Sequence, residues 1–217
     1  MKRLAPLTLV LLALPAVALA SGGSRMEQER LTRADMGLAK RAVARKVDLA
    51  RGWRLVSTQP GKRGADRCAG YDPDWSAFVI TGKARSIFSH RAGGQIVSDV
   101  AVFPNARHAA GDFKVGAKPG FLRCLRSAVL QGIRGEGFRA RVTSSRMSLT
   151  PRVGAQSVSY HVVTKVFPTN GVAPFKVYTD VLVLRQRRSL AGFVFTAPYG
   201  SISNRVGLAR SVARRLP

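Results

Sequence analysis

The stretch Gln95-Ile-Val-Ser-Asp-Val-Ala-Val-Phe103 decides the fold of this chain, because it predicts a strand that is buried on both sides. Side chains alternate between the two faces of a strand, and here both alternating sets are mostly apolar. We therefore expect this strand to lie in the middle of a sheet that is covered on both faces. Asp99 is the exception, and a half-buried carboxylate needs a partner. Because the chain contains 36 Lys+Arg, we expect an ion pair.

Two helices are predicted directly after this strand. Asn105 can cap the first helix, which we expect over Ala106–Phe113. Pro119 suits the first turn of the second helix, which should extend to about Gln131 and carries Cys124.

The chain has two cysteines, Cys68 and Cys124. In an exported protein, two cysteines favour a structural disulfide, which would join the second helix to the loop upstream of the central strand. Closing a loop of this length would stabilise the fold by about 4 kcal/mol in the chain-entropy model. Two buried free thiols are the alternative. The sequence shows no CxxC spacing and no metal-type cysteine cluster.

The first 20 residues have the pattern of a signal peptide. A basic start is followed by an apolar run over Leu4–Val17 and by the small-x-small cleavage pattern Ala18-Leu19-Ala20. We expect cleavage after Ala20 and a secreted or extracytoplasmic location. The apolar run is shorter than the roughly 20 residues of a membrane span. An uncleaved membrane anchor is the alternative.

The remainder reads as a flexible linker over residues 21–30 and a single α+β domain over residues 31–217. A capping-box pattern at Thr32 and Asp35 should begin a helix that extends to about Lys46, with Val47 in its buried stripe. A final helix is expected over Tyr199–Arg215. Between them, alternating apolar residues predict an antiparallel meander of four strands, over Phe138–Leu149, Ser157–Phe167, Phe175–Leu184 and Ala191–Ala197. Together these elements predict an antiparallel β-sheet flanked by helices on both faces, an α/β/α sandwich.

Several local motifs of this chain resemble those of exported actinobacterial proteins with a Mog1/PsbP-like fold. The extracellular sensor domains of mycobacterial Ser/Thr kinases are similar in general style. The resemblance rests on Thr32-Arg-Ala-Asp35-Met36, Asp48-Leu-Ala-Arg-Gly-Trp53, Ser98-Asp-Val-Ala-Val-Phe-Pro104 and Cys124-Leu125. Ala50 stands where the family's "DLPxGW" turn has proline, and no cysteine for lipidation follows the signal peptide. The resemblance implies an extracytoplasmic binding or sensor module without a shared catalytic set.

The net charge of +25 would attract polyanions such as acidic wall polymers, anionic lipid headgroups or nucleic acid. The alternative is compositional, because a chain rich in Ala, Arg, Gly and Val is typical of a high-GC genome. The basic residues are scattered rather than blocked, and we do not expect nucleic acid as the partner.

Catalytic and metal-binding motifs are not apparent. The three histidines lie far apart, and His161 alternates with core residues, so we expect it to face water. Asp66, Asp72 and Asp74 share a loop, but their spacing fits turn formation better than a calcium loop. There is no G-x-S-x-G elbow, and a paired-glutamate glycosidase is not expected. We therefore expect no enzyme, no metal and no cofactor.

Four aromatic residues flank predicted loops, namely Trp53, Tyr71, Trp75 and Tyr199. They could line a pocket for an apolar ligand. Ordinary core packing is the alternative.

Three functional hypotheses follow. The first is a non-enzymatic exported module that binds a small apolar ligand or an envelope protein in a cleft between the sheet and a helix. The second is an electrostatic adaptor that binds an anionic cell-wall polymer or lipid headgroups through an Arg-rich surface. The third is an unrecognised hydrolase, which would need a serine or cysteine beside a histidine and a carboxylate.

Overall fold

The fold is described from a computed structural model, which places residues 27–58, 68, 71–148, 153–168 and 172–217. The predicted signal peptide, residues 1–20, lies outside these ranges. Among the described residues, no helix is long and apolar enough to cross a membrane.

Seven antiparallel strands form the central sheet, in the order β2-β4-β5-β9-β8-β7-β6. The last four strands of the chain form the predicted meander, and β9 then pairs with β5 in the middle of the sheet. The strands are β2 (Trp53–Ser57), β4 (Gly82–His90), β5 (Gln95–Val102), β6 (Arg139–Ser148), β7 (Gln156–Phe167), β8 (Phe175–Gln186) and β9 (Ser189–Pro198).

The structure confirms the central position of β5. Its two faces contribute to different cores, with Ile96 and Val100 in one and Val97 in the other. Asp99 makes the expected ion pair, because the Arg85 guanidinium donates from Nε at 2.6 Å and from Nη2 at 3.0 Å.

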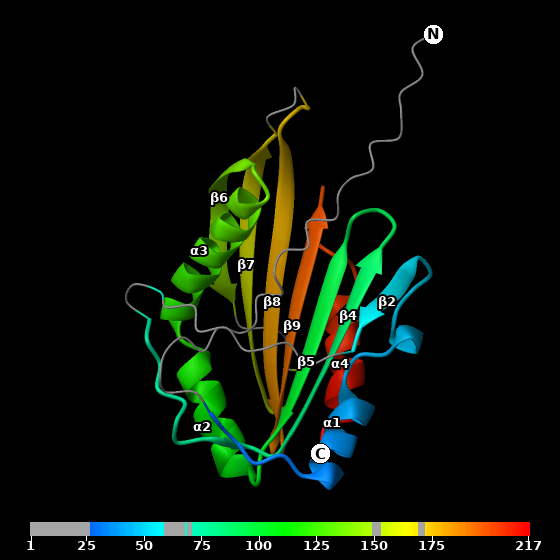
Figure 1. Cartoon of the computed structure of the whole chain (residues 1–217), viewed down its shortest axis with the longest axis vertical. Coiled ribbons are helices and arrows are strands. Elements are labelled where there is room, and N and C mark those ends of the chain that lie inside the picture. The colour runs from blue at the N-terminus through cyan, green and yellow to red at the C-terminus, as the bar shows by residue number, and fades with distance from the viewer. Residues whose placement is uncertain (1–26, 59–67, 69–70, 149–152, 169–171) are drawn as a thin grey trace.

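Helices cover both faces of the sheet, which makes the molecule an α+β sandwich (Figure 1). Apolar residues of α1 (Arg33–Ala42) and α4 (Arg205–Ala213) pack on one face, and those of α3 (Pro119–Gly135) pack on the other. The helix α2 (Ala106–Gly116) lies on the same face as α3. The two cores are therefore separated by the sheet.

The first helix begins as predicted but is held differently. Thr32 Oγ1 accepts a hydrogen bond from the backbone N–H of Asp35 at 3.1 Å, which is half of the capping box. A capping box also has a hydrogen bond from the N–H of Thr32 to the Asp35 carboxylate. That part of the prediction is wrong, because the Thr32 N–H donates to the carbonyl of Thr81. The Asp35 carboxylate instead accepts from Arg188, at 2.7 and 3.0 Å.

Both terminal helices are shorter than predicted. α1 ends at Ala42, where Val43 turns to an extended conformation, and only a 3₁₀ turn follows over Lys46–Asp48. Val47 is consequently 81% exposed rather than buried. α4 starts at Arg205 rather than Tyr199, because Asn204 has a left-handed backbone (φ 59°).

Part of the predicted linker 21–30 is structured. Gln28–Glu29 forms strand β1, which pairs in parallel with β3 (Val79–Ile80), and Glu27 is buried. The pairing of β1 with β3 uses backbone hydrogen bonds, which do not depend on apolar side chains. A polar segment can therefore be ordered against β3.

The predicted disulfide between Cys68 and Cys124 is present, with a Cα–Cα distance of 5.3 Å. Cys124 is buried on the face of α3 that packs on the sheet. The disulfide therefore ties α3 to the segment that precedes β3.

Candidate functional site

A groove with a volume of about 370 Å³ lies between the sheet and the N-terminal end of α4. Its apolar surfaces come from Ile96 on β5, Phe195 on β9, Trp53 on β2 and Leu208 on α4. Polar groups also line it, namely Asp48, Arg51, His90, Ser201, Ser203, Asn204 and Arg205. An apolar interior with a few polar groups is the usual composition of a small-molecule site.

Two glycines shape the wall of this groove. Gly52 has a φ of +94°, and a Cβ there would lie 2.4 Å from His90 Nε2, so only glycine fits. A Cβ at Gly94 would lie 3.2 Å from the ring of Trp53. The lack of a side chain at both positions leaves room for the Trp53 and His90 rings, whose centroids are 5.0 Å apart. The Gly52-Trp53 turn seen in the sequence therefore builds one side of the groove.

Asp48 lies at the groove but is fully engaged. Burial favours its neutral form, yet the Arg215 guanidinium donates to both carboxylate oxygens, at 2.7 and 2.8 Å. The net effect is a pKa of Asp48 below its ordinary value. This carboxylate stays charged and paired, so it is unsuited to proton transfer.

The groove also contains cations, one of them at the N-terminal end of α4. Asn204 makes no side-chain cap hydrogen bond to the first turn of α4. The guanidinium of Arg205 lines the groove there, 3.6 Å from the buried Asp180 carboxylate. Arg51 adds a second cation to the lining. These cations would favour a ligand that carries an acidic group.

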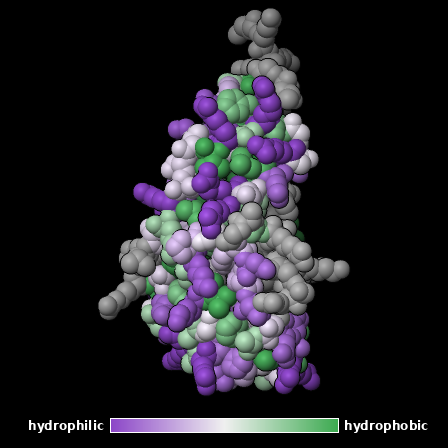
Figure 2. Space-filling model, turned by 90° about the vertical axis from the view of Figure 1, so that its left-hand side faces the viewer, coloured by the Kyte–Doolittle hydropathy of each residue, from purple (hydrophilic) through white to green (hydrophobic). Residues whose placement is uncertain are grey.

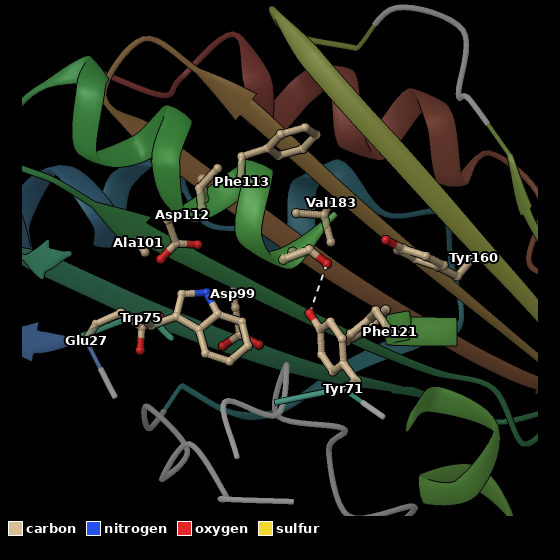
Figure 3. Close-up of a pocket in the computed structure, with 13 residues that line it drawn as sticks. Glu27, Tyr71, Trp75, Asp99, Ala101, Asp112, Phe113, Phe121, Tyr160 and Val183 are labelled. Carbon is tan, nitrogen blue, oxygen red and sulfur yellow. Dashed lines mark hydrogen bonds between the residues drawn. The ribbon is translucent and has the colours of Figure 1, made fainter. Parts of the chain in front are cut away.

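A second, smaller cavity of about 70 Å³ lies on the other face of the sheet (Figure 3). Aromatic rings line it, from Tyr71, Trp75, Phe113, Phe121 and Tyr160, together with the acidic side chains of Glu27, Asp99 and Asp112. Burial raises the pKa of the Tyr71 and Tyr160 hydroxyls. Tyr71 donates to the carbonyl of Gly116 at 3.2 Å, but the Tyr160 hydroxyl has no hydrogen-bond partner among the described residues. The volume suits a few water molecules rather than a drug-sized ligand.

The four aromatic residues singled out in the sequence do not line one common cavity. Tyr71 and Trp75 face the small cavity, in edge-to-face contact with each other. Trp53 lines the groove on the opposite face. Tyr199 is 74% exposed, contacts the ring of Phe175 and lines neither cavity. Sequence reasoning missed His90, Phe195 and Arg205, although Gly94 beside a turn was an available signal.

The histidines make separate local contacts. His108 Nδ1 accepts from the N–H of Val79, and His90 Nδ1 accepts from the N–H of Ala92. The prediction that His161 faces water is wrong. Its Nδ1 lies 2.6 Å from Asp180 Oδ1, and its side chain is only 19% exposed. Asp74 accepts from the Ser76 N–H, as expected of a turn, whereas Asp66 lies outside the described residues. Within the described ranges, no group of three metal-binding side chains occurs.

Comparison with solved structures finds the extracellular domain of PknH from Mycobacterium tuberculosis. The two chains are 10% identical, with a TM-score of 0.51, and the match covers 83% of this chain and 95% of that domain. At this identity the likeness shows a shared fold. No family model and no curated protein matches the sequence. The disulfide fits an extracytoplasmic location.

Proposed function

We propose that this protein is an exported, non-enzymatic binding module whose ligand is a small, largely apolar molecule with an acidic group. The observation that carries the proposal is the groove between the sheet and α4. Its volume of about 370 Å³ is within the range of small-molecule sites. Ile96 and Phe195 would contact the apolar body, and Arg205 would receive the acidic group.

The geometry at His90 argues against hydrolysis in this groove. In a catalytic triad, the histidine donates its Nδ1–H to a carboxylate so that Nε2 can accept a proton. Here His90 Nδ1 accepts a hydrogen bond from the backbone of Ala92, at 3.2 Å, which leaves the proton on Nε2. The nearby Asp48 is held by Arg215 instead. These contacts support binding rather than catalysis.

Native mass spectrometry of protein purified from its own envelope tests the proposal. At low and at high salt, we expect a bound species of a few hundred daltons, because apolar contacts are insensitive to screening. Ala197→Trp should remove it, since Ala197 lines the groove and a large ring would fill the space. Ala155→Trp is the matched control, because Ala155 is exposed and lies outside the groove. A bare wild-type protein, or an adduct that survives Ala197→Trp, would overturn the proposal.

A further inference from the structure

One half of the sheet is covered by a helix on a single face only. α3 packs against β6 and β7 on one side, whereas α1 packs on β4 and β5 and α4 on β8 and β9 on the other. The described helices thus leave the α4 side of β6 and β7 open. Figure 2 views the molecule from the side of α2 and α3, where hydrophilic side chains are distributed with apolar residues between them.

Three cations lie directly opposite one another on this open face. Strand register places Arg141 of β6 opposite Lys165 of β7, and Lys165 opposite Lys176 of β8. We call these three residues the basic row. Neighbouring strands are about 5 Å apart, so the row crosses three strands within about 10 Å. Arg141 and Lys176 are exposed, and Lys165 is half-buried.

The basic row has no carboxylate within ion-pair distance among the residues that the structure describes. Like charges that face each other across a sheet destabilise it. A row four residues away along β7 shows the other solution. There Arg146 is opposite His161, and His161 is opposite the buried Asp180 that also lies near Arg205. The fold therefore supplies an acid to one row and none to the other.

The ring of Phe167 contacts two cations of the basic row. The guanidinium of Arg141 lies 5.7 Å from the centre of its ring, and the ammonium of Lys165 lies 5.4 Å from it. These cation–π contacts stabilise the two cations next to each other. Arg139 is opposite Phe167 and is also exposed, so a fourth cation extends the surface along the edge strand β6.

We propose that the basic row, with Arg139 and Arg146, binds an anionic polymer of the cell envelope across strands β6, β7 and β8. Lysine ammonium and arginine guanidinium groups donate to phosphate or carboxylate oxygens. Each exposed ion pair is weak in water, so a single small anion would gain little from this open surface. A chain that carries many anionic groups engages several cations at once, which multiplies the affinity.

The test compares two triple variants of the full chain with equal charge. The first is Arg141→Gln, Lys165→Gln and Lys176→Gln. The control, Arg126→Gln, Lys114→Gln and Lys118→Gln, removes the same residue types from exposed positions on α2, on α3 and at the N-cap of α3. Long-chain inorganic polyphosphate is the probe, titrated at low salt and at about 0.5 M salt, where exposed ion pairs are screened. Thermal unfolding checks that both variants are folded.

We expect the row variant to lose at least tenfold in affinity for polyphosphate, and the control to lose about twofold or less. An equal loss in both variants would overturn the proposal, since net charge alone would then explain binding. Row-dependent binding to phosphatidylglycerol vesicles without binding to polyphosphate would overturn it in favour of a membrane surface. Ala197→Trp should leave polyphosphate binding unchanged, so this proposal and the groove proposal can fail separately.

Discussion

The two faces of the sheet are completed in different ways. On the α3 face, a helix of 17 residues covers β6 and β7, the disulfide ties it in place, and a cavity of only about 70 Å³ remains. On the α4 face, the two helices have 10 and 9 residues, and a groove of about 370 Å³ stays open beside them. Short helices cannot cover seven strands.

On the open face, the side of α1 and α4, two ion pairs add to the buried apolar core. Arg188 binds Asp35 at the start of α1, and Arg215 binds Asp48 after its end. Both arginines come from the C-terminal part of the chain and both carboxylates from the N-terminal part. Both faces therefore bury an apolar core, but a disulfide reinforces the α3 face, whereas ion pairs reinforce the α4 face, which leaves surface available for binding.

The largest expected effect concerns the disulfide on the closed face. Replacing Cys68 and Cys124 together by serine should lower the free energy of unfolding by about 4 kcal/mol, because the unfolded chain gains loop entropy. Urea denaturation of the variant and of wild type measures the difference. A loss below about 1 kcal/mol would contradict a stabilising role for the disulfide.

The charged pairs of the open face should come next. Asp35→Asn or Asp48→Asn should each cost about 2 to 3 kcal/mol, since each leaves a partly buried guanidinium without its carboxylate. Glu29→Gln is the matched control, because Glu29 binds Lys83 at the surface with its side chain 45% exposed. That substitution should cost less than about 1 kcal/mol. An equal loss of unfolding free energy in all three variants would mean that the partly buried pairs stabilise the protein no more than the surface pair does.

The same pairs predict a dependence of stability on pH. Hydrogen bonds from Arg188 hold the pKa of Asp35 below its ordinary value of 3.8, and the pKa of Asp48 is also lowered. Their contribution is therefore present above pH 3.8 and is lost as the pH falls through the lower pKa values of the folded state. Unfolding measured from pH 6 down to pH 2 should show a shallower decline in Asp35→Asn than in wild type. Parallel curves would disprove this origin.

On the closed face, the two buried tyrosines should respond oppositely to loss of the hydroxyl. Tyr160→Phe should raise the free energy of unfolding by about 1 kcal/mol, because it removes a buried hydroxyl without a partner in the described structure. Tyr71→Phe should lower it by about 1 kcal/mol, since it removes the hydrogen bond to Gly116. Thermal or urea unfolding separates the two. A loss in Tyr160→Phe would mean that its hydroxyl is hydrogen-bonded.

The smallest expected effect concerns the basic row. Lys176→Gln should stabilise the protein by about 0.5 kcal/mol at low salt, because it removes one of two facing ammonium groups. The gain should disappear at about 0.5 M salt. Lys114→Gln, on α2, should change the free energy of unfolding by less. A salt-independent effect of Lys176→Gln would mean that charge repulsion is not its cause.

Patterns that repeat along the chain predicted most of the elements. The alternation within Gln95–Phe103 was sufficient to place β5 in the middle of the sheet, and the strands of the meander lie within a few residues of their predicted bounds. Helix ends were predicted less well. The expected end of α1 near Lys46 failed because spacing cannot show that Val43 becomes extended, and Asn204 likewise shortened α4.

The sequence by itself determined the sandwich architecture, the disulfide partners and the partner type of Asp99, because these depend on local periodicity, on cysteine number and on an excess of arginine. Tertiary structure alone decided which residues meet. Asp35 and Arg188 are 153 residues apart, and the register of β6, β7 and β8 places Arg141, Lys165 and Lys176 side by side. Shifting the register of a strand by one residue moves its side chains to the other face. The pairing of strands therefore fixed both the groove and the basic row.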